Sequence, residues 1–193
     1  MQFEIVRAVP KDAEALYKIM ETVTAGMEHS EWFVSDDLSY IQNHIGSEPI
    51  QKSNKGFVLK AIAAADNMTA GNVENSADTR EEIAGFLMVD FPGIDAHNLG
   101  TYLSMSDAQL VKVAHMDSVV ILPKYRGNGL QHKLMETAER IIKKETDYRI
   151  LLATVHPENV YSLRNATDRG FRAAKEVTAY GTYQRYVMIK EIV

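Results

Sequence analysis

The pattern of apolar and polar positions predicts strands alternating with helices along the chain. Period-two alternation or a short apolar run indicates a strand, and an apolar stripe at i, i+3, i+4 and i+7 indicates a helix. Strands are expected at residues 3–8, 56–65, 83–91, 116–122, 149–155, 172–180 and 184–192. Helices are expected at residues 10–23, 36–45, 130–145 and 157–169. This order favours one α/β domain over residues 1–193, since the length suits a single core.

Two segments interrupt this alternation. Residues 66–82 are polar and rich in small side chains, and the strands that flank them closely indicate a flexible hairpin loop rather than a domain linker. Residues 93–113 form an insertion in which Ser106 and Asp107 could cap a short helix. Ser35 is the expected cap of the second helix, and the last two strands are expected to form a hairpin.

Composition and charge exclude several classes of function. The net charge of −5 argues against general nucleic-acid binding, and the absence of cysteine excludes disulfides and thiolate chemistry. The chain starts without a signal-peptide pattern and has no apolar run long enough for a membrane span, so we expect a cytoplasmic protein that does not bind membranes. His29, His44 and His97 show no metal-ligand spacing, and we expect no metal.

A glycine-containing loop carries the first chemical signal. Arg126-Gly127-Asn128-Gly129 follows an apolar strand and precedes a helix, whose N-terminal amides attract phosphates. Lys124 and Lys133 could add charge-assisted contacts. The loop lacks the G-x-x-x-x-G-K-[ST] pattern of a Walker motif, and it does not fit the G-x-G-x-x-G dinucleotide fingerprint because His132 stands three residues after Gly129. A purely structural turn is the alternative.

The stretch V-V-I-L-P-K-Y-R-G-N-G-L-Q-H-K-L-M-E resembles the acyl-CoA-binding signature of the GNAT superfamily of N-acyltransferases. In that family an R-x-x-G-x-[GA] loop binds the coenzyme A pyrophosphate through backbone amides. Arg126, Gly129 and Gln131 fall on its three defined positions. Gln131 departs from the usual glycine or alanine, so it could crowd the helix start or join the coenzyme contacts.

A second stretch, V-H-P-E-N-V-Y-S-L-R-N-A-T-D-R-G-F, resembles the family's later block, in which N-x-x-[AS] lies on a helix that ends in G-F. Asn159 and Ser162 are expected to share a helical face that meets the pantetheine arm and phosphates. The resemblance implies a GNAT-like α/β fold with a mixed, mostly antiparallel sheet splayed at strands four and five and flanked by helices. The implied coenzyme contacts are Val119, Val120, Ile121, Arg126, Gly127, Asn128, Gly129, Leu130, Gln131, Asn159 and Ser162.

The resemblance further implies an N-acetyltransferase that moves an acetyl or other acyl group from acetyl-CoA directly to a primary amine of a small molecule or peptide. Pantetheine would pair with the strand near residues 119–121, where one N–H would polarise the thioester carbonyl. An amine with a pKa of about 10.4 needs a base to remove its proton. Asp117 is the expected base, and His115, Glu82 and Glu28 are weaker candidates. Asp117 could instead bond a backbone amide at a strand entry, and His115 could be a solvated strand-end residue.

The general acid departs from the family pattern. Many members carry a tyrosine seven residues after the asparagine, and Ala166 stands there in this chain. A thiol with a pKa near 8.5 leaves fairly well as an anion, so the loss is tolerable. Tyr161 and His156 are the expected substitutes. Tyrosines of the final hairpin are further candidates, although packing or a surface role is the alternative for each: Tyr180, Tyr183 and Tyr186.

The acceptor site is expected between the first two helices and the final hairpin. Its candidate residues, which could hold a cationic amine or simply belong to the core, are Met27, Glu28, His29, Trp32 and Phe33. Ala166 also supports a rival function, a non-catalytic acyl-CoA-binding sensor or interaction module. A scaffold with a structural glycine turn is a third alternative. The final hairpin could pair across a homodimer.

Overall fold

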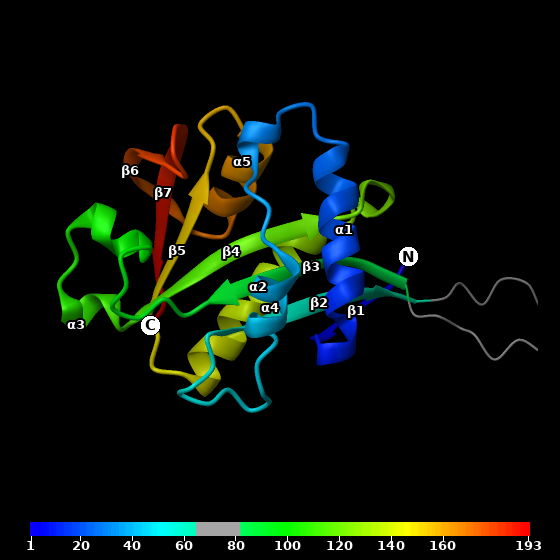
Figure 1. Cartoon of the computed structure of the whole chain (residues 1–193), viewed down its shortest axis with the longest axis horizontal. Coiled ribbons are helices and arrows are strands. Elements are labelled where there is room, and N and C mark those ends of the chain that lie inside the picture. Colours follow the sequence, from blue (N-terminus) through cyan, green and yellow to red (C-terminus); the bar gives the residue numbers. More distant parts are fainter. Residues whose placement is uncertain (65–81) are drawn as a thin grey trace, which may run out of the picture.

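The structure, a computed structural model that describes residues 1–64 and 82–193, contains a seven-stranded sheet with helices on both faces (Figure 1). The strand order is β1-β2-β3-β4-β5-β7-β6, and β4–β5 is the parallel pair in an otherwise antiparallel sheet. The strands are β1 (Phe3–Arg7), β2 (Gly56–Ala63), β3 (Glu82–Asp90), β4 (Val113–Ile121), β5 (Ile150–Val155), β6 (Arg172–Ala179) and β7 (Tyr183–Glu191). The mixed, mostly antiparallel sheet and the final hairpin are confirmed.

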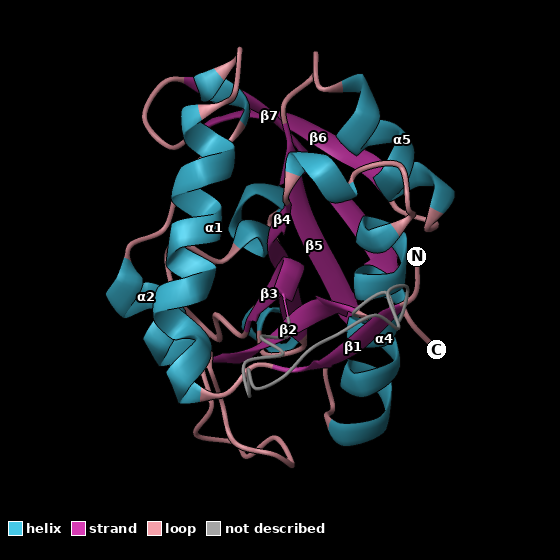
Figure 2. Cartoon of the chain, turned by 90° about the vertical axis from the view of Figure 1, so that its right-hand side faces the viewer, coloured by secondary structure: helices cyan, strands magenta, loops and turns pink. Residues whose placement is uncertain are grey.

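Helices form a layer on each side of the sheet (Figure 2). The first layer holds α1 (Ala13–Ala25) and α2 (Leu38–His44), and the second holds α4 (Leu130–Glu145) and α5 (Val160–Asp168). Each longer helix buries the apolar stripe that the sequence predicts, so that separate hydrophobic clusters form under α1 and under α4. Short 3-10 helices lie in the connections at η1 (Pro10–Asp12), η2 (Ser30–Trp32), η3 (Leu99–Leu103) and η4 (Pro123–Tyr125).

Three predicted element boundaries were wrong, and for the two helices the reason is that the side-chain cap lies elsewhere. The α2 helix is capped by Asp37, whose carboxylate accepts from the Tyr40 N–H at 2.7 Å, and not by Ser35. The α5 helix begins at Val160 and not at residue 157, because Asn159 is its cap and accepts from the Ser162 N–H at 3.1 Å. Strand β4 begins three residues earlier than predicted, at Val113.

The insertion before β4 covers the part of the sheet that α1 and α2 leave open, on the same side of the sheet as these helices. It contains η3 and the short helix α3 (Asp107–Leu110), which starts as predicted after Ser106 but ends before residue 113, where β4 begins. Leu99 of η3 packs with Val113, Leu152 and residues of β6 and β7 in a third cluster. The predicted loop at 66–82 lies outside the described residues except for Glu82, and the strands beside it, β2 and β3, pair antiparallel.

Candidate active site

Strands β4 and β5 separate after a short common stretch. They pair over Val113–His115 and Ile150–Leu152, and then β4 runs on to Ile121 while β5 turns away beside β7 (Figure 1). This confirms the splayed sheet. The Leu122 N–H bonds the Ala84 carbonyl of β3, so by strand alternation the amides of Val119 and Ile121 face the gap.

Val120 differs from the prediction. The same alternation turns its N–H toward β3, and its side chain is buried under α1. Val120 therefore contributes packing to the edge of the gap, whereas Val119 and Ile121 contribute the free amides.

A β-bulge places Asp117 at the start of this gap. Met88 pairs with Ser118 and Val89 with Met116, so Asp117 has no partner on β3. Met116 and Val119 both pack on the α4 side, although regular alternation would put them on opposite faces. The bulge therefore turns two consecutive polar side chains, Asp117 and Ser118, toward the α1–α2 side.

The Asp117 carboxyl is buried, and no residue within 1–64 and 82–193 forms an ion pair with it. Its Oδ2 has no hydrogen-bond partner among the described residues, so the alternative role of bonding a backbone amide is not observed for this atom. Burial, together with the charges of Asp36 and Asp90, raises the pKa of Asp117 to about 7. Asp36 lies beside it and accepts from the Ser118 hydroxyl at 2.9 Å. Such a carboxyl can exchange a proton near neutral pH.

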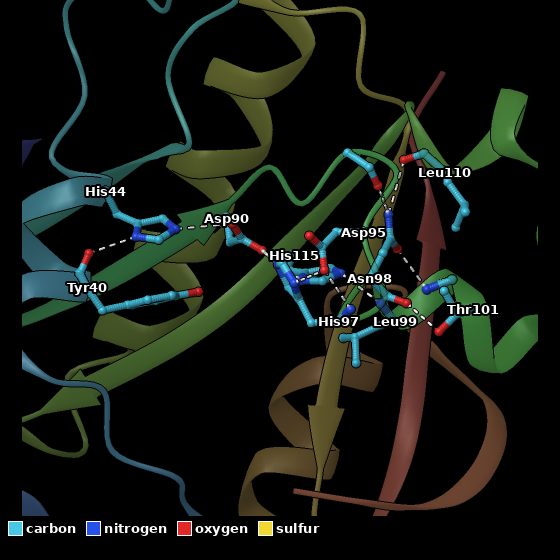
Figure 3. A network of polar contacts seen from close by, with 12 residues as sticks. Tyr40, His44, Asp90, Asp95, His97, Asn98, Leu99, Thr101, Leu110 and His115 are labelled. Atoms are coloured by element: carbon cyan, nitrogen blue, oxygen red, sulfur yellow. Dashed lines mark hydrogen bonds and ion pairs between the residues drawn. The ribbon is translucent and has the colours of Figure 1, made fainter.

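His115 is buried rather than solvated, which corrects the sequence-based alternative. It is 4% exposed, and its Nε2 accepts from the Leu99 N–H at 3.1 Å, so the proton sits on Nδ1, which lies 3.1 Å from Asp90 Oδ2. His44 approaches the other oxygen of Asp90, Oδ1, with its Nε2 at 3.1 Å (Figure 3). His115 thus belongs to a structural network and is not a free base.

The geometry of His44 requires an imidazolium. Its Nδ1 lies 2.8 Å from the Tyr40 carbonyl and its Nε2 faces Asp90, so both nitrogens meet acceptors. Burial opposes this charge, but Asp90 and the Tyr40 carbonyl outweigh it and raise the pKa of His44. Burial likewise opposes ionisation of Asp90, yet His115 and His44 lower its pKa to about 2. The His44–Asp90 ion pair joins α2 to strand β3 of the sheet, near Asp117.

A His44→Leu variant should lose about 3 kcal/mol of unfolding free energy near pH 6, because it leaves the Asp90 carboxylate buried without its cation. Because the pKa of His44 is raised in the folded state, the stabilisation by the His44–Asp90 pair is complete below about pH 6.5. It is lost as pH rises through the pKa of His44 in the folded protein. The lowered pKa of Asp90 makes its contribution vanish as pH falls toward about 2. Urea denaturation at several pH values measures both limits. His97→Leu, at a 61% exposed side chain, should change little, and equal losses would contradict the assignment.

The predicted coenzyme loop opens onto free space. Gly127 and Gly129 have φ angles of +80° and +68°, and a Cβ on either would meet no atom within 4 Å. Gly129 is the N-cap of α4 and offers no side-chain acceptor, so the first-turn amides of α4 stay available to an anion. Asn128 holds the loop shape by donating to the Tyr125 carbonyl at 3.0 Å. Arg126 is exposed beside it.

Lys124 and Glu82 neutralise each other. Glu82 forms an ion pair with Lys124 and also accepts from the Tyr125 hydroxyl. Lys124 therefore does not offer the free charge that the sequence suggested, and Glu82 is not a free base. Lys133 and Glu28 are both exposed.

Gln131 joins two helices. Its Oε1 accepts from the Asn165 Nδ2 at 2.8 Å, which ties the first turn of α4 to α5. Gln131→Ala should therefore cost about 1 kcal/mol of stability and leave acetyl-CoA affinity within about twofold, since backbone amides are the expected contacts. Thermal melts and calorimetric titration would test this. A tenfold loss of affinity would instead make its side chain a coenzyme contact.

The two expected acids are poorly placed for donation. Tyr161 is 79% exposed on α5, and Ala166, at the family's tyrosine position, is buried. His156 Nδ1 accepts from the Glu158 N–H at 3.2 Å, and its ring stacks on Trp32 at 6.0 Å between centroids. Trp32 also stacks on His29, so part of the predicted acceptor set gathers beside His156.

Arg185 joins β7 to the connection between α1 and α2, and sequence reasoning missed it. It is 2% exposed, and its Nη2 donates to the Glu31 carbonyl of η2 at 2.7 Å. Its guanidinium lies over the rings of Tyr180 and Tyr183. An arginine on a terminal strand resembles ordinary surface charge, so nothing local in the sequence distinguishes it. Here it ties the α1–α2 connection to β7.

Within residues 1–64 and 82–193, no three His, Asp or Glu side chains are grouped as a metal site requires. No helix in those same ranges has the length and apolar character needed to cross a membrane.

Comparison with known proteins gives a consistent result. The profile of the acetyltransferase (GNAT) family matches residues 54–171, while no curated protein sequence matches the chain. The GNAT acetyltransferase of Streptococcus pneumoniae aligns with a TM-score of 0.65 and 20% identity, covering 100% of both chains. Arabidopsis thaliana NAA60, in complex with a bisubstrate analogue, aligns at 0.67 and 14%, also covering 100% of both. Salmonella typhimurium yncA, with its cofactor acetyl-CoA, aligns at 0.65 and 13%, covering 100% of this chain and 95% of that one.

The solved structures share the fold, and the family profile spans more than half of the chain, including β4, the glycine loop and α5. The splayed strands and the open helix N-terminus lie inside that matched region. The chain therefore belongs to the acetyltransferase (GNAT) family of acetyl-CoA-dependent N-acetyltransferases.

Proposed function

We propose that this acetyltransferase moves the acetyl group of acetyl-CoA directly to a primary amine of a small molecule or peptide, with Asp117 as the base. The observation that carries the proposal is the unpartnered, buried Asp117 oxygen at the bulge beside the gap between β4 and β5. A base is required because the amine is protonated at neutral pH. With a pKa of about 7, Asp117 can both accept that proton and release it.

The donor would lie in the gap. Free amides of Val119 and Ile121 would pair with the pantetheine, and one of them would stabilise the negative charge on the thioester oxygen. The pyrophosphate would bind the first-turn amides of α4 beyond Gly127 and Gly129, beside Arg126.

Asn159 and Ser162 would have a smaller role than the sequence suggested. The Asn159 Oδ1 and the Ser162 N–H bond each other in the helix cap. The Asn159 amide nitrogen and the Ser162 hydroxyl are the groups that would remain for the coenzyme.

The acceptor amine would approach from the α1–α2 side, toward which Asp117 and Ser118 point. Asp36 and Asp117 give this entrance a negative potential as they ionise, which favours a cationic amine. The η2 connection with Trp32 and the β6–β7 turn border the same entrance, held together by Arg185. A cytoplasmic location and a homodimer remain predictions.

Thiol release tests the function directly. The chain contains no cysteine, so a thiol reagent reports coenzyme A without background from the protein. Acetyl-CoA would be supplied with free amino acids, putrescine, spermidine, tyramine and short peptides with free N-termini. We expect amine-dependent thiol release with at least one of them. Calorimetric binding of acetyl-CoA without release for any amine would favour the non-catalytic binding module, and absence of binding would overturn both.

A further inference from the structure

The departing thiolate has no tyrosine donor at the positions that the sequence suggested. Ala166 has no acidic proton, and Tyr161 is turned to solvent on the outer side of α5. His156 accepts a backbone hydrogen bond on Nδ1, and its ring lies beside Trp32 with 6.0 Å between the ring centroids. Ala166 and Tyr161 therefore offer no proton at the gap between β4 and β5, and the His156 ring is engaged by the Glu158 N–H and by Trp32.

Tyr180 stands out by its backbone conformation. It lies in the turn between β6 and β7 with a φ of +52°, a left-handed angle that a bulky residue adopts at a cost of about 1–2 kcal/mol. Gly181, the next residue, also has a positive φ, of +90°, which a glycine adopts freely, whereas Tyr180 does not. The Tyr180 Oη lies 3.2 Å from the Thr154 Oγ1 of β5. A strained backbone thus supports a hydroxyl held against the strand that borders the gap.

Strand register places this hydroxyl across the gap from Asp117. The last β4–β5 pair is His115 with Leu152, and two further residues along each strand reach Asp117 and Thr154. Leu152 packs in the cluster under η3, and Ala153 packs on the α4 side, so Thr154 returns to the face on which Asp117 lies. Tyr180 as a whole is 48% exposed, but its partial burial raises its pKa and the nearby Asp117 charge raises it further, which keeps the phenol protonated.

We propose that Tyr180, rather than a residue of α5, is the proton donor to the coenzyme A sulfur, which rests on the transfer function proposed above. Asp117 first takes the ammonium proton and releases it to water. The free amine nitrogen then attacks the thioester carbon and gives its next proton to Asp117. The C–S bond then breaks, the sulfur keeps the electron pair, and Oη of Tyr180 transfers its proton to it. Arg185, whose guanidinium lies 5.6 Å from the Tyr180 ring centroid, stabilises the phenolate until it regains a proton from water.

Tyr180→Phe keeps the ring and removes the proton. We expect kcat for thiol release to fall about 10- to 100-fold with any amine that the wild type acetylates, while the Kd of acetyl-CoA stays within about twofold. Tyr183→Phe is the matched control, since Arg185 lies over that ring too, and Tyr161→Phe tests the sequence-based candidate. Both controls should retain wild-type kcat.

The acetyl selenoester of coenzyme A separates acid catalysis from a structural effect. A selenol ionises more easily than a thiol, so its anion leaves without a proton donor, and Tyr180→Phe should approach the wild-type rate with it. A wild-type kcat in Tyr180→Phe, or an equal loss with both donors, would overturn the role of Tyr180. Failure of the wild type to release thiol with any amine would instead overturn the transfer function itself.

Discussion

Asp117→Asn should lower kcat by about 10²- to 10³-fold at pH 7.5 while leaving acetyl-CoA affinity within about twofold. Asparagine preserves the size of the side chain and its place in the bulge, but it cannot take the amine proton. The wild-type kcat/KM should rise with pH through about 7 as Asp117 ionises, and the variant should lack this rise. Initial rates of thiol release between pH 5.5 and 9 measure both effects.

A measurement of the free energy of unfolding distinguishes loss of the base from damage to the fold. The pKa of Asp117 is raised in the folded protein. Between about pH 4 and pH 7, the folded state therefore holds a proton that the unfolded state has lost, and the free energy of unfolding falls as pH rises. Removing this carboxylate should therefore stabilise the protein at pH 8, on the order of 2 kcal/mol. A variant that is both less active and less stable at pH 8 would contradict the assignment.

Asp36→Asn is the control for local charge. It removes a negative group that raises the pKa of Asp117 but leaves the base itself in place. The rise of kcat/KM should move to lower pH, and the rate at pH 7.5 should be largely kept. If Asp36→Asn instead abolished turnover and Asp117→Asn did not, the two carboxyls would have the opposite roles.

Local patterns were sufficient for most of the elements. The stripe of α4, the alternation in β1 and the apolar run of β3 depend on side chains a few residues apart, and the structure has these elements where expected. The start of α5 was misjudged because Pro157 is an acceptable first helical residue, whereas the Asn159 cap depends on a side-chain hydrogen bond that spacing does not reveal.

The chemistry of the site depends on contacts that are remote in sequence. Asp117 could be chosen from its place before the glycine loop, but its bulge requires β3, and its unusual pKa requires Asp36 and burial. Ser118 meets Asp36 across 82 residues, and Arg185 meets Glu31 across 154. Tyr180 could be named as a candidate, but its left-handed φ and its contact with Thr154 appear only in the folded chain.

Gly129→Trp should abolish measurable acetyl-CoA binding, with at least about a 100-fold rise in Kd. The indole would fill the open space in front of the α4 N-terminus, where a Cβ on Gly129 meets nothing within 4 Å, and would cover the amides that the pyrophosphate needs. Calorimetric titration with acetyl-CoA measures the loss directly, without any need to know the acceptor amine.

Gly93→Trp supplies the matched control for this substitution. Gly93 has a φ of +61°, close to the +68° of Gly129, and its Cβ position is equally open. Both variants force a bulky residue into the left-handed region, so both should lose about 1–2 kcal/mol of stability. They should differ in binding, because Gly93 follows β3 and lies at no helix N-terminus. Equal affinities for acetyl-CoA in the two variants would mean that the coenzyme does not use the α4 amides. Loss of affinity in Gly129→Trp alone would locate the pyrophosphate at that helix.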